Sequence, residues 1–174
     1  MTEQRLLNSR DYFENVVKLA YERFSNSEAN FLDAYSLAMG LYHMHEWVFH
    51  HDLAKVKSKF GIEVRTAGKL WKFVESEIEG AGLIRDMNNA AKHVKLQFDP
   101  GHPQARDPST EMHDAANTSI ASFGYGEGSF GIGPFGGKSF FVLDVGGKTV
   151  SLRPVATDVY NYWECLIKEF YPDL

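Results

Sequence analysis

The sequence has 174 residues, of which 44% are hydrophobic and 14% aromatic, so it can form a single domain with a real core and is not globally disordered. Its net charge of −5 does not suit a protein that coats nucleic acid, although a local basic patch can still bind it. Cys165 is the only cysteine, which excludes an internal disulfide and favours a reducing, cytoplasmic location.

Two helices are predicted first. Residues 5–25 place apolar side chains three and four positions apart, as one face of a helix requires. Ser27 is a suitable N-cap for a second helix that runs to about Lys55 or beyond. Polar residues interrupt the apolar stretch of this second helix, so we expect a buried amphipathic helix and no membrane span.

Two shorter helices follow, over residues 63–80 and 83–96, separated by Gly80 and Gly82. Residues 99–119 are rich in Pro, Asp and Ser and are typical of a long loop.

The C-terminal part of the chain mixes strands with one more helix. Apolar runs on both sides of Gly146 and Gly147 predict a β-hairpin. Residues 155–171 have the spacing of a closing helix. We therefore expect one mainly α domain, 1–174, that forms an antiparallel bundle of about five helices with a β-hairpin inserted before the last helix.

This domain divides into three parts by sequence. The bundle is expected at residues 5–96, the loop and hairpin at 97–153 and the closing helix at 155–171. The segment GPFGGKS, residues 133–139, lacks the glycine spacing of a phosphate-binding loop, and a strand follows it where a helix would be needed. No cofactor is expected.

Two stretches have alternative interpretations. Six cations between Lys55 and Lys72, interleaved with Phe60 and Trp71, form either a solvated face or a patch for phosphate backbones. His43, Glu46 and His50 share one helix face, which is either a polar surface or part of a metal site.

His45 differs from its histidine neighbours because it shares the apolar stripe of the second helix. We expect it to point into the bundle, where it could meet a ligand.

The stretch RDMNNAAKHVKL, residues 85–96, crowds polar side chains onto the fourth predicted helix. Helical spacing divides them into a stripe of Asp86, Asn89 and His93 and an adjacent cationic stripe of Arg85 and Lys92. In this hypothesis His93 is a general acid or base, oriented by Asn89 and Asp86. Arg85 and Lys92 would bind phosphate. The alternative is a polar helix end whose groups satisfy one another.

RDMNNAAKH on a late helix of a bundle resembles the HEPN domains (higher eukaryote and prokaryote nucleotide-binding), in which Arg, usually a polar residue, and then His form the motif. Here seven residues separate Arg85 from His93, where the family has four to six. The octet DMNNAAKH also looks like a motif of uncharacterised bacterial proteins. An offset of eight rotates Arg85 and His93 by about 80° about an ideal helix.

The resemblance implies a metal-independent endoribonuclease of a bacterial defence or toxin system, acting as a homodimer on RNA. The alternative function is a non-catalytic bundle that binds a partner protein or small ligand through the glycine- and aromatic-rich loop 122–137.

Overall fold

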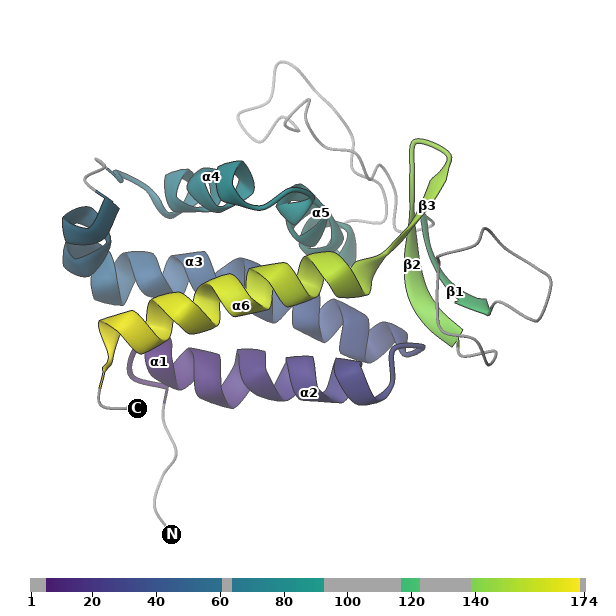
Figure 1. Ribbon diagram of the computed structural model, residues 1–174, viewed down its shortest axis with the longest axis horizontal. Helices are drawn as coiled ribbons and strands as arrows, with labels where there is room; N and C mark the ends of the chain where they lie inside the picture. The colour runs from purple at the N-terminus through teal and green to yellow at the C-terminus, as the bar shows by residue number, and fades with distance from the viewer. Residues whose placement is uncertain (1–5, 61–63, 93–116, 123–138, 173–174) are drawn as a thin grey trace, which may run out of the picture.

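The computed structural model describes residues 6–60, 64–92, 117–122 and 139–172 (Figure 1). The helical elements are α1 (Ser9–Tyr12), η1 (Phe13–Val17), α2 (Lys18–Asn26), α3 (Phe31–Phe60), α4 (Ala67–Glu77), α5 (Ala81–Lys92) and α6 (Leu152–Phe170). The first three follow one another without a break as one rod, in which η1 is a π-helical segment. The described residues therefore contain five helical rods, and the prediction of a mainly α bundle is confirmed.

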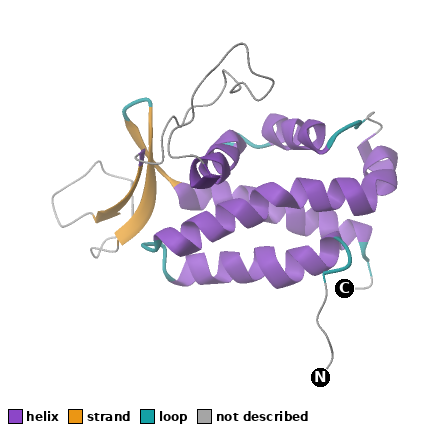
Figure 2. Cartoon of the chain, turned by 180° about the vertical axis from the view of Figure 1, so that it is seen from behind, coloured by secondary structure: helices purple, strands orange, loops and turns teal. Residues whose placement is uncertain are grey.

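The long helix α3 organises the bundle. It packs against α1, η1 and α2 on one side, against α4 and α5 on the other, and against α6 along its length. Figure 1 and the reverse view in Figure 2 show α3 and α6 crossing the middle of the molecule. α5 contacts α3, α6 and α4.

A small sheet covers one end of the bundle (Figure 2). Its strands are β1 (Thr118–Ser122), β2 (Ser139–Val145) and β3 (Lys148–Ser151), in the order β1-β2-β3 with both pairs antiparallel. Gly146 and Gly147 make the predicted turn, with φ angles of 58° and 80° that favour glycine. β1 was not expected, because its polar sequence lacks a strand signal of its own.

The sheet is tied to the turn between α2 and α3. The backbone N–H of Phe141 donates to the carbonyl of Glu28 at 2.9 Å, and the Glu28 carboxylate pairs with Arg153 at the start of α6. The Phe31 ring meets the Phe141 ring edge-on at 5.3 Å. These contacts fix the hairpin relative to the bundle, where two strands alone would be marginal.

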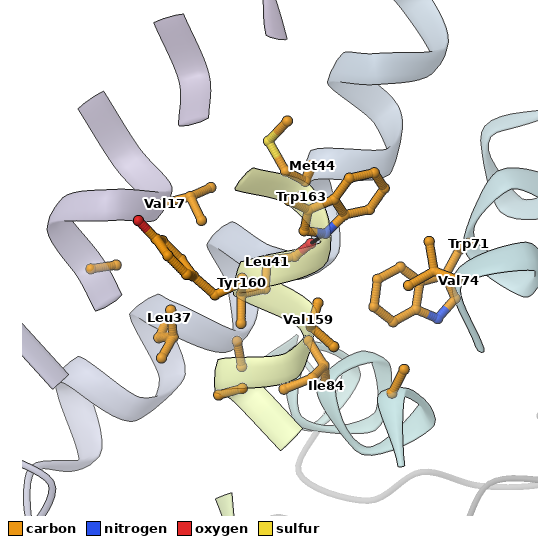
Figure 3. Close-up of a cluster of buried hydrophobic side chains, with 14 of the residues drawn as sticks. Val17, Leu37, Leu41, Met44, Trp71, Val74, Ile84, Val159, Tyr160 and Trp163 are labelled. Carbon is orange, nitrogen blue, oxygen red and sulfur yellow. Dashed lines mark hydrogen bonds between the residues drawn. The ribbon is translucent and has the colours of Figure 1, made fainter. Parts of the chain in front are cut away.

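The core lies between α3 and α6 and continues under α4 and α5 (Figure 3). Trp163 of α6 is fully buried, and its Nε1–H donates to the carbonyl of Leu41 on α3 at 3.1 Å. Trp71 of α4 and Ile84 of α5 close the other side. Each indole combines a large apolar area with one polar group, and that group finds a partner here.

Several helix ends differ from the prediction, and α4 spans only Ala67–Glu77 where residues 63–80 were expected. Ser27 does not cap α3 but ends α2, where its N–H bonds the carbonyls of Arg23 and Phe24. Asn30 performs the capping, since its Oδ1 accepts from the N–H groups of Leu32 and Asp33. α6 begins at Leu152, three residues earlier than expected. Among the described residues, no helix is both long and apolar enough to cross a membrane.

Candidate functional site

α5 carries most of the predicted site residues. Seven of its eleven residues with described burial are buried, because α5 lies against both α3 and α6. Gly82, Arg85 and Asn89, at positions i, i+3 and i+7, form a half-buried edge. Lys92 is the last residue of the helix, and His93 lies outside the described residues.

Arg85 is held by two carboxylates. Its Nη1 lies 2.8 Å from Oε1 of Glu75 on α4, while its Nη2 and Nε each lie 3.2 Å from Oδ1 of Asp86. Only 11% of the Arg85 side chain is exposed, against 19% for Glu75 and 1% for Asp86. The guanidinium therefore joins α4 to α5 from a mostly buried position.

Glu75 has a second contact that fixes it. Its Oε1 also accepts a hydrogen bond of 2.7 Å from Nε1 of Trp71, one helical turn earlier. Neither Glu75 nor Trp71 was predicted to belong to this site. Their spacing of four positions on one helix could have predicted the contact between them, but nothing in the sequence indicated a contact with Arg85.

The exposure of the predicted polar residues does not follow the two stripes that helical spacing predicted. Asp86 and Asn88 are each 1% exposed, whereas the Arg85 side chain is 11% exposed and Asn89 is half-buried. Both amide atoms of Asn88 are buried, and neither has a hydrogen-bond partner among the residues that the structure describes. Asp86 thus lies beneath Arg85 and is removed from the edge that it was expected to share with Asn89.

His45 points into the bundle, as predicted, and is 3% exposed. Its Nδ1 donates to the carbonyl of Tyr42, so the neutral ring carries its lone pair on Nε2. Burial lowers the pKa of His45, and the hydrogen bond to Tyr42 opposes this only in part.

Aromatic rings connect His45 to the Arg85 cluster. The Tyr42 ring lies 4.7 Å from the His45 ring and 4.9 Å from the Trp71 ring, centroid to centroid. Burial raises the pKa of the Tyr42 hydroxyl; the Arg85 charge lowers it, and nearby carboxylates including Glu75 raise it. His45 and Arg85 therefore belong to one region where α3, α4 and α5 meet.

The metal alternative on α3 gains no support from the described part of the chain. His43 Nδ1 and Glu46 Oε2 are 3.2 Å apart. His50 is exposed, and its ring meets the Phe49 ring edge-on. Within the described ranges, no group of three or more His, Cys, Asp or Glu side chains is placed to hold a metal ion.

The basic stretch from Lys55 to Lys72 lies partly on the surface of α3, where acids compensate it. Lys55 lies 3.0 Å from Asp52 and 3.8 Å from the centre of the Tyr171 ring. Lys59 pairs with Glu169 across an open hollow of about 470 Å³ between α3 and α6. These partners reduce the positive charge that this surface offers to phosphate.

Comparison with family models, with curated proteins and with solved structures finds no match to this chain. Its class therefore rests on the fold itself, a five-rod helical bundle covered at one end by a three-stranded antiparallel sheet. The resemblance to HEPN domains stays a prediction.

Proposed function

We propose that this protein acts on RNA as a metal-independent endoribonuclease of the HEPN type. The observation that supports this function best is the half-buried edge of α5, formed by Gly82, Arg85 and Asn89. The helix continues to Lys92, so the edge leads toward the residues for which the sequence predicts chemistry. In this proposal an RNA strand approaches α5 along this edge.

The chemistry needs proton transfer and charge stabilisation. A 2′-hydroxyl attacks the adjacent phosphorus, the P–O5′ bond breaks, and the products carry a 2′,3′-cyclic phosphate and a 5′-hydroxyl. His93 would act as acid or base, and Asn89, one helical turn before it in sequence, would orient the imidazole. Lys92 and Arg85 would stabilise the charge on the phosphate. Asp86 acts through Arg85, since it is buried beneath it.

The test is RNA cleavage in the presence of a chelator. The protein, His93→Ala and Arg85→Ala are incubated with tRNA and mixed RNA, and the new ends are identified. We expect cleavage by the parent chain, with cyclic-phosphate ends, and its loss in His93→Ala. His50→Ala, at an exposed histidine of α3, is the matched control and should cleave normally. Equal absence of cleavage in all four proteins would reject the proposal.

The assembly and location follow from the same resemblance. We propose a homodimer in a bacterial cytoplasm, since HEPN sites are usually completed across two copies. Sedimentation of the purified chain over a range of concentrations tests the dimer, and a monomer at micromolar concentration would contradict it.

A second candidate is a non-catalytic bundle that binds a partner protein or small ligand. Two observations favour it. Arg85 is compensated by two carboxylates, and large apolar side chains are exposed on α2 and α3, including Leu19, Leu32 and Met39 at 51%, 67% and 47%. The loop 122–137, which the sequence offers as the contact, lies outside the described residues except at Ser122.

This candidate is tested by capturing partners from a lysate of the source cells. The parent chain is compared with a variant lacking residues 123–137 and with Leu32→Glu/Met39→Glu. An unchanged set of captured partners in both variants would remove this function.

A further inference from the structure

The end of the molecule opposite the sheet is positively charged, although the whole chain is acidic. Residues 55–72 hold six Lys and Arg residues and one acid, a formal charge of +5 in a chain whose total is −5, so the remaining residues carry −10. Figures 1 and 2 show the end of α3 beside α4 at this end of the bundle, away from the sheet. A local excess of positive charge attracts anions even to an acidic protein.

Two lysines of this surface have no acidic partner in the described part of the chain. Lys55 and Lys59 have the partners described above. Lys57 of α3 and Lys69 of α4 are both exposed, and among the described residues neither lies within ion-pair distance of a carboxylate. Their ammonium groups can therefore bind an anion from outside without first breaking an ion pair.

A pair of partly exposed aromatic rings accompanies these two lysines. The Phe60 ring of α3 and the Phe73 ring of α4 lie 4.9 Å apart, centroid to centroid, and both residues are half-buried. Lys57 comes three residues before Phe60, and Lys69 comes four residues before Phe73, so each lysine shares a helix face with a ring. The contact between the rings therefore brings the two lysine–ring pairs together.

Phe73 is not a core residue. Leu70, Trp71 and Val74 form the buried stripe of α4, whereas Phe73 lies outside the core and outside the side chains that pack against it. A ring that stays partly in solvent beside lysines suits a ligand that has both a planar part and a negative charge. Single-stranded RNA has both, since its phosphates bind cations and its unpaired bases stack on aromatic side chains.

We propose that Lys57, Phe60, Lys69 and Phe73 form a second contact surface for RNA, the lysine–phenylalanine surface. The two lysines bind phosphates of a single strand, and one base stacks on the Phe73 ring. This inference rests on the proposed RNA function and adds where the strand is held outside the half-buried edge of α5.

Helix α4 joins this surface to the proposed site. Glu75 of α4 contacts Arg85 of α5, and Lys69 lies six residues before Glu75. Six residues correspond to about 9 Å along an ideal helix. One RNA strand of a few nucleotides would therefore contact both regions.

The lysines are tested by the salt dependence of binding. Lys57→Ala/Lys69→Ala is compared with Lys18→Ala/Lys148→Ala, which removes two positive charges from α2 and β3. The probe is a fluorescent 2′-O-methyl oligouridylate, which lacks the attacking 2′-hydroxyl and is not cleaved. Binding is measured by anisotropy over a range of salt concentrations, with chelator present.

The expected result follows from counterion release. Each phosphate neutralised on a single strand contributes about 0.7 to the slope of log K against log salt, so Lys57→Ala/Lys69→Ala should reduce this slope by about 1.4. Lys18→Ala/Lys148→Ala should leave the slope unchanged. Equal slopes in the two variants would overturn the surface.

The ring is tested with Phe73→Leu, which keeps an apolar side chain but removes the planar face. Loss of one stacked base should weaken oligouridylate binding about tenfold. Phe73→Trp should bind at least as tightly as the parent chain. Inorganic polyphosphate has the charge but no bases, so its binding should not change in Phe73→Leu.

Three results of these assays would overturn the stacking contact. The first is unchanged oligouridylate binding in Phe73→Leu, and the second is an equal loss for oligouridylate and polyphosphate. The third is binding of the parent chain to vesicles of anionic lipid but not to oligouridylate, which would assign the surface to a membrane.

Cleavage assays separate this surface from the proposed catalysis. Lys57→Ala/Lys69→Ala should raise KM for RNA and leave kcat nearly unchanged, because these lysines hold the strand away from the reacting phosphate. If the binding results hold and the parent chain cleaves no RNA, the surface stands and the nuclease is rejected. If the parent chain cleaves RNA and the double variant has the same KM, the surface is overturned and the nuclease stands.

Discussion

The hydroxyl of Tyr171 lies 3.0 Å from Oδ1 and 3.1 Å from Oδ2 of Asp52, which ties the end of α6 to the middle of α3. Asp52 is 2% exposed and leaves helical geometry, with φ −125° and ψ 16°, so it marks a kink in the 30-residue helix. Ser9 donates to the same carboxylate, and Lys55 pairs with it. Three segments that are distant in sequence therefore meet at one buried acid.

Asp52→Ala should destabilise the protein by about 3 kcal/mol, because it removes a buried acceptor shared by Ser9, Tyr171 and Lys55. Urea unfolding followed by circular dichroism measures this loss. Asp158→Ala, at an exposed acid of α6, is the matched control and should change stability by less than about 0.5 kcal/mol. Similar small losses in both variants would show that the Asp52 contacts contribute little.

The protein should become less stable in mildly acidic solution because His45 is buried as a neutral imidazole. Burial holds the pKa of its imidazole below the ordinary value of 6.5. The unfolded chain therefore binds this proton more readily than the folded protein does. The free energy of unfolding therefore decreases as the pH falls through about 6.5. The decrease is at most about 1.4 kcal/mol per pH unit for this one proton.

Urea unfolding between pH 7.5 and pH 5 tests this effect. His45→Gln should flatten the pH dependence by the contribution of one proton, and His50→Gln controls for the loss of an imidazole. A slope unchanged in His45→Gln would contradict the burial effect on this residue.

Asn88→Leu should stabilise the protein by about 1 kcal/mol, because both amide atoms are buried with no partner in the described part of the chain and leucine removes that polar cost. Thermal unfolding measures the change. Asn89→Leu, at the half-buried neighbour, should bring no comparable gain. A loss of stability in Asn88→Leu would mean that a water molecule or another group satisfies the amide.

Gly80→Ala should destabilise the turn between α4 and α5. Gly80 has φ +81°, which costs a residue with a Cβ about 1–2 kcal/mol, and the new Cβ would lie 3.0 Å from Cγ2 of Val155. Gly68→Ala, where a Cβ meets nothing within 4 Å, should not destabilise the protein. Denaturant midpoints of the two variants compare these positions, and equal values would contradict the strain at Gly80.

Local signals account for much of the fold. Apolar spacing predicted the helical rods, and Gly146 and Gly147 predicted the hairpin, because both depend on residues that are neighbours in sequence. The same reasoning failed at Ser27, which was as good a capping residue by type as Asn30. It also failed at β1, which is a strand through its pairing with β2.

The site divides in the same way. Sequence alone identified α5 as the polar helix and placed His45 on a buried face, since both follow from periodicity. Only the tertiary structure decided that Glu75 holds Arg85 and that Asp86 lies beneath it. Whether a charged group faces solvent or an opposite charge depends on which helix packs above it. That choice is made by the burial of apolar surface over the whole bundle, which no short stretch of sequence encodes.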